Sequence, residues 1–498
     1  MKLISATFPI LMIGLIVLSC TVLCILNSEK GHNWGGDFSL YIHQAKSINE
    51  GTSHQLAMAN KYIVENSSVH TFSPTLYPWG FPILLAPIYA IYDVDYTVFR
   101  LLEAIFLICA LLMMFLTFRS GGAFKQTNGL FFFAIIGFNI SYITAINSVL
   151  SEIPFLLFSF ISLFLILKLL RNHYSNSWIR SVGVGFMLFF CFSIRSEGIG
   201  LFLALFIGQI HYLLINRKEQ PVLAAKHLIF LAPYLTALFS YYFLKLLLPS
   251  GFTSHFSYNN LISWDTSLRN LEVYYKWFKD PLFGNLAIPY FLHLTLLIAF
   301  VGMGYRIKKD VVLLTYLGFL IILFTIWPFR ELRYLYSIYP FILYFLIQGL
   351  QYLFKLSKEN VFVKYFSLFV LCVCLSTNLI KTYKATFKAV KSPSQMVFGP
   401  ESPESKELFE YIIENTQEQD IIGFFRPRVM HLYTNRLSLA LFNSTTEILE
   451  KSNYYVENKS VGNFFQIPME HESHRLSDQF KKVFSNGSFN VYKIITND

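Results

Sequence analysis

Charged side chains are scarce in this sequence. Asp, Glu, Lys and Arg together make up 14% of the 498 residues, whereas hydrophobic residues make up 54%. Because a soluble protein carries about 25% charged residues, this balance excludes a water-soluble fold for most of the chain and favours one built in lipid. The net charge of +10 does not indicate nucleic-acid binding, because much of the basic charge stands in short segments between apolar runs, where it sets membrane topology.

Cysteines are also few, and the six that occur all lie inside apolar stretches. This placement excludes a disulfide framework and a cysteine-based zinc site outside the membrane. No Gly-rich phosphate loop follows a strand pattern, so a soluble nucleotide-binding domain is not expected. No cofactor is indicated, although a divalent cation stays open. The histidines of the segment 27–96 fit no metal signature; they are His32, His43, His54 and His70.

What the sequence does contain is a series of eleven apolar runs. Most have the length of a membrane-spanning helix. Two of them, 181–194 and 198–215, are shorter and flank a polar turn, so they either both cross the membrane or form one re-entrant hairpin, which leaves nine spans. The runs are 7–26, 97–118, 128–147, 152–170, 181–194, 198–215, 228–248, 286–305, 311–327, 335–354 and 361–380.

The basic residues between these runs fall on one face of the membrane, which the positive-inside rule identifies as the cytoplasmic face. The segment 27–96 then forms a large first external loop, and everything after residue 391 lies on the same outer side. Frequent Lys, Ile, Asn and Phe are typical of an AT-rich bacterial genome. We therefore expect a multi-pass protein of a bacterial plasma membrane, with its functional groups on the outer face.

The composition changes near residue 391, where Ser, Glu, Asn and Lys become frequent. Helix starts are indicated at Ser402-Pro403 and at the capping-box pattern Ser444-Thr445-Thr446-Glu447, and strands at 420–425, 463–467 and 488–494. The sequence thus predicts an α-helical polytopic membrane domain over 1–390 and a small extracytoplasmic α/β domain over 391–498.

One carboxylate stands at the start of the first external loop. Asp37 follows two glycines and precedes a helical pattern that ends at Gly51; the apolar positions of this pattern are Phe38, Tyr41, Ile42, Ala45 and Ile48. One interpretation of Asp37 is a helix N-cap, which accepts hydrogen bonds from free backbone N–H groups. The other is a general base at the membrane surface, which takes the proton from an acceptor hydroxyl or amine.

Further charged residues lie at the outer ends of the apolar runs. Glu152, with Ser151 as its cap, either balances a helix dipole or shapes a substrate pocket, since a carboxylate near the membrane is costly without a role. Arg330 and Arg333 flank Glu331. They are either membrane anchors or a clamp for a phosphate group, which a guanidinium group binds bidentately.

Two other motifs have weaker signals. Arg195 and Glu197 meet at the turn between the two short runs, where a structural ion pair is the favoured interpretation and a phosphate contact the alternative. The motif Tyr77-Pro78-Trp79-Gly80-Phe81-Pro82 is expected to fix a turn and an interfacial helix over 80–91, with Tyr77 and Trp79 seated among the lipid headgroups.

The order of these motifs and their membrane placement resemble the lipid-carrier-dependent glycosyltransferases with the GT-C fold, the superfamily of protein O-mannosyltransferases and aminoarabinose transferases. The resemblance covers nearly the whole chain and rests on the motifs at Asp37, Tyr77–Pro82, Ser151-Glu152 and Arg330–Tyr334. It implies a GT-C fold of about eleven transmembrane helices. Many relatives carry a second acidic residue directly after the first; Phe38 stands there in this sequence, which excludes a pair of carboxylates at this motif.

The resemblance also implies roles for the candidate residues. Asp37 and Glu152 would be the catalytic-site carboxylates. The donor phosphate would be bound by arginines, namely Arg330, Arg333 and Arg195. The substrate pocket would be lined by Tyr77, Glu197 and Tyr334.

The function implied is transfer of a sugar from a polyprenyl-phosphate carrier to an acceptor outside the cytoplasm, such as a glycolipid, a glycan or a protein. Asp37 would be the general base, and no nucleotide would be needed. One rival hypothesis is a transporter or flippase of lipid-linked sugars, and another is a non-catalytic membrane protein of envelope assembly. Transporters place polar groups near the bilayer midplane. The charges here gather at one edge of the membrane and no duplicated halves are visible, which favours the enzyme.

Overall fold

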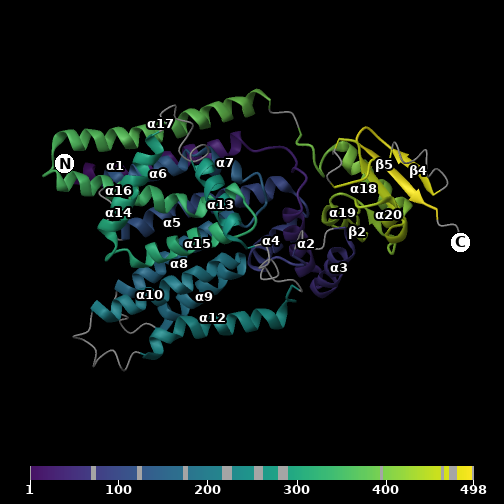
Figure 1. Cartoon of the computed structure of the whole chain (residues 1–498), viewed down its shortest axis with the longest axis horizontal. Helices are drawn as coiled ribbons and strands as arrows, with labels where there is room; N and C mark the ends of the chain where they lie inside the picture. The colour runs from purple at the N-terminus through teal and green to yellow at the C-terminus, as the bar shows by residue number, and fades with distance from the viewer. Residues whose placement is uncertain are drawn as a thin grey trace.

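The structure is a computed structural model. It describes residues 2–68, 74–120, 126–171, 178–215, 227–251, 262–278, 290–392, 396–460, 465–469 and 479–495. These residues form a long bundle of apolar helices with a small α/β domain at one end (Figure 1).

Six helices are long and apolar enough to cross a membrane. They are α5 (Tyr96–Ser120), α8 (Glu152–Arg171), α10 (Ile199–Ile215) with the preceding 3-10 turn η1 (Ser196–Gly198), α12 (His227–Leu247), α16 (Tyr339–Leu356) with the preceding 3-10 turn η5 (Leu332–Ser337), and α17 (Val361–Lys391). The protein is therefore an integral, multi-pass membrane protein.

Five further apolar helices account for the remaining predicted runs. They are α1 (Lys2–Leu26), α6 (Gln126–Gly137), α9 (Trp178–Ile194), α14 (Phe291–Arg306) and α15 (Val311–Ile326). The run predicted over 128–147 is wrong as a single helix. The Asn139 side chain accepts a hydrogen bond from the backbone N–H of Ser141, and this cap starts a separate short helix, α7 (Ile140–Ala145).

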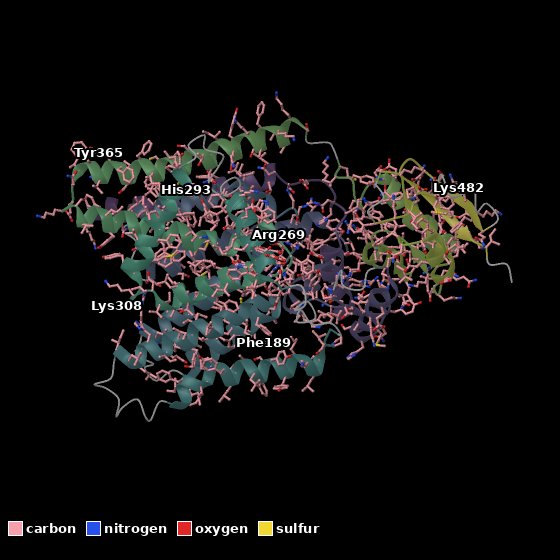
Figure 2. The ribbon with its side chains drawn as sticks, viewed as in Figure 1. Phe189, Arg269, His293, Lys308, Tyr365 and Lys482 are labelled. Carbon is pink, nitrogen blue, oxygen red and sulfur yellow. The ribbon has the colours of Figure 1, made fainter. Side chains whose placement is uncertain are left out.

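The transmembrane helices run along the length of the molecule, with α17 along one side and α12 along the other (Figure 1). The N-terminus lies at one end of the bundle, and the C-terminus lies beyond the other end. Figure 2 shows Lys308 at the end of the bundle that is remote from Lys482, which lies on the C-terminal sheet. The end that carries Lys308 is the one that the basic loops predict to be cytoplasmic.

Helices α14 and α16 cross at very short range. A Cβ atom added at Gly302 would lie 2.0 Å from the backbone oxygen of Phe345, and one at Gly349 would lie 2.0 Å from that of Ile298. Glycine is required at both positions, because lipid supplies no hydrophobic force between helices and close backbone packing has to hold them together.

The first external loop folds into three helices between the bundle and the C-terminal domain (Figure 1). They are α2 (Asp37–Glu50), α3 (Ser53–Asn66) and α4 (Gly80–Tyr92). The predicted helix after Asp37 is confirmed, and Gly51 ends it in the left-handed conformation that favours glycine, with φ of 70°. A further amphipathic helix, α13 (Trp264–Trp277), lies in the next long external segment and was not predicted.

The C-terminal domain contains a five-stranded sheet in the order β2-β1-β3-β5-β4. Its strands are β1 (Ile422–Gly423), β2 (Ser438–Leu439), β3 (Tyr454–Asn458), β4 (Phe480–Ser485) and β5 (Phe489–Ile494). Strand β1 is parallel to β2 and β3, and β5 is antiparallel to β3 and β4. The helices are α18 (Pro403–Asn415), α19 (Pro427–Thr434) and α20 (Thr445–Lys451).

The sequence predicted the helix starts of this domain better than its strands. Ser402 and Ser444 accept hydrogen bonds from the backbone N–H groups of Ser405 and Glu447, as caps do. The strand expected over 420–425 is only two residues long in the structure, β1. In the strand expected over 463–467, residues 463 and 464 lie outside the described residues, and the rest is not a strand. Strands β3 and β4 and helix α19 were not predicted.

The chain after α17 returns to the start of the first external loop and fixes it in place. The backbone N–H of Val397 donates to the carbonyl of Lys30 at 2.9 Å. The indole of Trp34 then packs edge-on against a group of C-terminal phenylalanines, Phe398, Phe424, Phe425 and Phe489. This contact positions the segment that leads into Asp37 between the two domains.

Candidate active site

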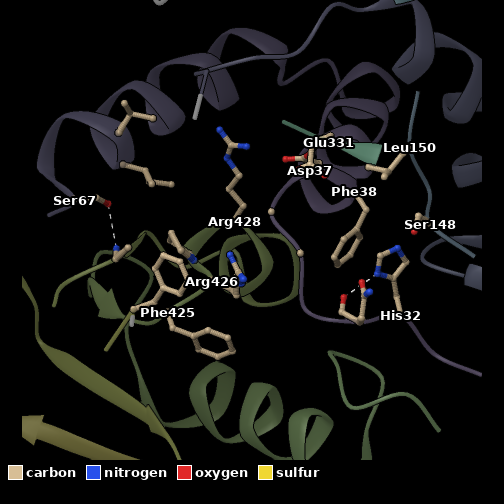
Figure 3. Close-up of a pocket in the computed structure, with 18 of the residues that line it drawn as sticks. His32, Asp37, Phe38, Ser67, Ser148, Leu150, Glu331, Phe425, Arg426 and Arg428 are labelled. Carbon is tan, nitrogen blue, oxygen red and sulfur yellow. Dashed lines mark hydrogen bonds between the residues drawn. The ribbon is translucent and has the colours of Figure 1, made fainter. Parts of the chain in front are cut away.

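A cavity of about 520 Å³ lies where the C-terminal domain meets the membrane domain, at the end that the basic loops predict to be the outer one (Figure 3). The first external loop lines it with residues between 32 and 38 and between 63 and 67. The membrane domain adds Ser148, Leu150, Glu331 and Arg333, and the C-terminal domain adds residues 425–428, Ala440, Phe442 and Phe465. A substrate in this cavity would contact three parts of the chain at once.

Asp37 lies at the wall of this cavity as the first residue of α2. Its carboxylate accepts a hydrogen bond from the Tyr77 hydroxyl at 2.7 Å and one from Nη2 of Arg333 at 3.0 Å. The N-cap is Gly36, and no side chain caps α2. The N-cap interpretation of Asp37 is therefore wrong: its carboxylate bonds to two side chains instead of the backbone, and 35% of the side chain is exposed.

Three neighbours keep Asp37 ionised. Burial alone would raise the pKa of its carboxyl group, but the charge of Arg333, the hydrogen bond from Tyr77 and the charge of Arg428 lower this pKa below its usual value. The N-terminus of α2 adds a favourable dipole for an anion. Asp37 therefore carries a full negative charge at neutral pH.

Tyr77 and Trp79 do not lie among the lipid headgroups, so that prediction is wrong. The backbone of Tyr77 exchanges two hydrogen bonds of 2.9 Å with the side-chain amide of Gln44, and its ring stacks on that of Tyr41 with centres 4.6 Å apart. Trp79 is buried, and its Nε1 donates to the carbonyl of Pro249 at 2.7 Å. The motif folds back onto α2, which brings the Tyr77 hydroxyl to Asp37.

A network of ion pairs lies beneath Asp37 at the outer ends of the membrane helices. Nη1 of Arg195 is 2.5 Å from Glu152, and Nη2 of Arg195 is 2.6 Å from Glu197. Nε of Arg333 is 3.2 Å from the same Glu152. Glu152 thus joins the two arginines, and through Arg333 the network reaches Asp37. It is not among the residues that line the cavity, so its place in the structure is that of a positioning residue.

The hydroxyl of Ser151 belongs to this network. It lies 2.9 Å from the Tyr41 hydroxyl and accepts a hydrogen bond from Nη1 of Arg195 at 3.2 Å. The residue expected to cap Glu152's helix therefore also orients Arg195. The Tyr334 ring covers the same guanidinium group from another side, with its centre 5.7 Å away, and it does not line the cavity.

Arg330 and Arg333, the two arginines of the expected phosphate clamp, lie in different surroundings. Arg333 faces the cavity, whereas Arg330 is exposed and is not one of the lining residues. The backbone at Glu331 is extended, with φ of −136° and ψ of 134°, and the 3-10 turn η5 begins directly after it. Arg330 and Arg333 therefore do not both line this cavity.

Among the described residues, no group of three or more His, Cys, Asp and Glu side chains could hold a metal ion. The ring of His32 lies on Phe38, with centres 3.8 Å apart, and the ring of His43 contacts His431 of α19, with centres 4.6 Å apart. His70 lies outside the described residues.

The sequence analysis missed three charged residues at this site. Arg426 and Arg428 line the cavity from the C-terminal domain, and the buried Glu103 of α5 interacts electrostatically with Glu152. A carboxyl group inside an apolar span is itself a signal of function, so Glu103 could have been found from the sequence. The two arginines had no such signal, because only the tertiary fold brings residues 426–428 to Asp37.

No protein-family model matches this sequence, and no curated protein matches it. Solved structures of ArnT from Cupriavidus metallidurans are similar to it in fold. The apo structure gives a TM-score of 0.53 at 11% identity and covers 98% of this chain and 98% of its own. The structure bound to undecaprenyl phosphate gives 0.51 at 10% identity and covers 97% and 98%. The fold class is therefore that of a GT-C-type membrane protein with a C-terminal α/β domain.

Proposed function

We propose that this protein is a membrane glycosyltransferase that moves a sugar from a polyprenyl-phosphate carrier to an acceptor outside the cytoplasm. The observation that carries the proposal is Asp37, an ionised carboxylate in a cavity of about 520 Å³ at the outer end of the membrane helices. The fold supports it, since ArnT shares that fold over nearly its whole length and one ArnT structure is bound to undecaprenyl phosphate.

In this proposal Asp37 is the general base. The acceptor binds in the cavity with its hydroxyl or amine at the Asp37 carboxylate, which takes the proton as the acceptor attacks the anomeric carbon of the sugar. The bond to the carrier phosphate breaks as the new glycosidic bond forms, so the polyprenyl phosphate leaves with the bonding electron pair. Tyr77 orients the carboxylate by its hydrogen bond of 2.7 Å.

A donor phosphate in the cavity would compete with Asp37 and Glu152 for the guanidinium group of Arg333. Arg333 lies 3.0 Å from Asp37 and 3.2 Å from Glu152, with a quarter of its side chain exposed. A phosphate in the cavity shares this guanidinium group and stabilises the leaving group as its charge develops. Arg333 then attracts Asp37 less strongly and the pKa of Asp37 rises, so donor binding makes Asp37 a stronger base.

Lipid analysis of a deletion strain tests this function. If the protein consumes a polyprenyl-phosphate-linked sugar, the strain accumulates one glycosylated polyprenyl phosphate in the outer leaflet of its plasma membrane. The wild-type gene on a plasmid removes the lipid, and the Asp37→Asn variant does not, because the amide cannot accept the proton.

Asp95→Asn is the matched control. Asp95 also stands at a helix start, but its carboxylate caps α5 by accepting hydrogen bonds from the backbone of Thr97 and Val98. Since Asn caps as well as Asp, this variant should remove the lipid like the wild type. Accumulation in the inner leaflet would indicate a flippase instead, and an unchanged lipid profile in the deletion strain would contradict both functions.

A further inference from the structure

The positive charges on the membrane side of the cavity are already neutralised by carboxylates. Arg195 is paired with Glu152 and Glu197, and Arg333 is paired with Asp37 and Glu152. Glu331 lies 4.0 Å from Nε of Arg333 as well, so two arginines face four carboxylates. A phosphate that shares Arg333 therefore finds no net positive charge on this side of the site.

The surplus lies on the opposite wall, in the segment that joins β1 to α19. Arg426 and Arg428 both line the cavity, and neither forms an ion pair with a carboxylate in the part of the chain that the structure describes. Figure 3 shows both side chains rising from the C-terminal domain on the side of the cavity across from Asp37.

Arg428 is the more deeply buried of the two. Only 7% of it is exposed, and its Nη2 donates to the carbonyl of Pro74. Its Nη1 is buried and has no hydrogen-bond partner among the residues that the structure describes. A buried N–H group of a charged side chain without an acceptor is costly, so the free group indicates that an acceptor arrives from elsewhere.

Arg426 is held in place by aromatic rings instead of carboxylates. Its guanidinium carbon lies 5.8 Å from the ring centre of Phe425 and 5.3 Å from that of Phe465, and its Nε is also buried without a partner among the described residues. The rings fix the direction of the side chain, and the charge of Asp37 acts on it without a direct ion pair in the described part of the chain. Arg426 is the N-cap residue of α19, so the positive end of that helix dipole faces the same space.

We propose that Arg426 and Arg428 form an oxyanion site on the C-terminal domain, which binds a phosphate group carried by one of the two substrates. The inference rests on the proposed function for the identity of those substrates. The phosphate belongs either to the polyprenyl carrier or to the acceptor. In both cases the C-terminal domain supplies part of the active site, and Arg426 and Arg428 add the positive charge that Arg333 alone does not provide.

The test uses the purified full-length protein in detergent and three probes: undecaprenyl phosphate, undecaprenol and inorganic phosphate. Native mass spectrometry measures the affinity for the two lipids, which differ only in the phosphate. Thermal unfolding measures stabilisation by inorganic phosphate. The test variants are Arg426→Gln and Arg428→Gln. A third variant, Arg426→Lys, retains the charge without the bidentate group. Arg269→Gln, at an exposed position on α13, is the control.

If the carrier supplies the phosphate, Arg426→Gln weakens undecaprenyl phosphate binding about 10- to 100-fold, leaves undecaprenol binding unchanged, and is only partly rescued by Lys. If the acceptor supplies it, undecaprenyl phosphate binding is kept and stabilisation by inorganic phosphate is lost. In the described part of the chain the Arg426 side chain makes no hydrogen bond, so this variant tests the inference even if Arg428→Gln, which loses the bond to Pro74, does not fold.

The inference is overturned if Arg426→Gln binds both phosphate probes as the wild type does. Failure of the proposed function gives a different result. In that case the wild type shows no preference for undecaprenyl phosphate over undecaprenol, whereas stabilisation by inorganic phosphate still depends on Arg426.

Discussion

The membrane domain contains an ion-paired cluster near each end, and the two clusters differ in how completely they are closed. At the end remote from the C-terminal domain, Arg306 binds both carboxylate oxygens of Asp310 at 2.7 and 2.8 Å, and the Tyr344 hydroxyl donates to one of them at 2.6 Å. The side chains of Arg306 and Asp310 are only 7% and 2% exposed. At the outer end, Asp37 and Arg333 are 35% and 25% exposed and face a cavity.

This difference separates a structural ion pair from a reactive one. A closed bidentate pair has no room for another ligand, so its value lies in neutralising a charge that would be costly in lipid. In the outer cluster, two arginines share four carboxylates and solvent reaches the centre, so a substrate can exchange with one of the partners. The presence of an ion pair alone would not have distinguished the two.

The largest effect is expected from Asp37→Asn. Removing a general base lowers the rate about 10²- to 10⁴-fold, whereas the thermal stability should change little because Asp37 does not cap α2. The rate at which a complemented deletion strain clears its accumulated lipid measures the first effect, and thermal unfolding of the purified protein measures the second. Near-normal clearance would show that Asp37 is as structural as Asp310.

Asp310→Asn should show the opposite pattern. It leaves the buried Arg306 without a counter-charge, which typically costs about 3–5 kcal/mol of stability. We expect a lower midpoint of thermal unfolding and a lower yield, while the protein that folds binds undecaprenyl phosphate normally. A selective loss of lipid binding without loss of stability would contradict a purely structural role for the inner cluster.

Arg333→Ala and Arg330→Ala sharpen the comparison within the outer end. Loss of Arg333 leaves Asp37 and Glu152 short of one partner and should weaken donor use by about 2–5 kcal/mol. Loss of the exposed Arg330 should change neither donor use nor stability by more than about 0.5 kcal/mol. If the two variants weakened donor affinity equally, both arginines would bind the donor phosphate, as the sequence predicted.

The smallest effect concerns the contact that holds the C-terminal domain on α2. Burial lowers the pKa of His431 to about 4, aided by Lys46, and burial beside His431 and Lys46 lowers the pKa of His43 well below its usual value. Both rings are therefore neutral in the folded protein, whereas the unfolded chain takes up protons near pH 6.5.

The contribution of His431 to stability should accordingly be constant above pH 6.5, fall as the pH drops from 6.5 toward 4, and level off below, while His43 also lowers the stability as the pH drops below 6.5. The slope is at most about 1.4 kcal/mol per pH unit for each ring. Thermal unfolding of the wild type and of His431→Gln at pH 7.5 and 5 measures this effect. The change in stability between the two pH values is compared between the two proteins, so the contributions of other titrating groups cancel. A variant with the same pH dependence as the wild type would show that the contact does not titrate.

The parts of the molecule that sequence patterns predicted are those governed by local rules. Apolar runs identified the membrane helices, because a span in lipid must be long and apolar whatever surrounds it. Gly51 and the serine caps at 402 and 444 identified helix ends, because capping involves residues only a few positions apart. Strand β2, of two residues, has no comparable local signal, and β1 is shorter than its apolar pattern predicted.

Composition and apolar runs were enough to predict a multi-pass membrane protein with a small α/β domain after it, and the positions of Asp37, Arg195 and Arg333 at the ends of those runs singled them out. The partners of these residues depend on the tertiary structure. It paired Asp37 with Tyr77 and Arg333, turned Arg330 away, and brought Arg426 and Arg428 across from Asp37. The physical reason is distance along the chain: Arg333 lies 296 residues from Asp37, and no periodicity or spacing rule reaches that far.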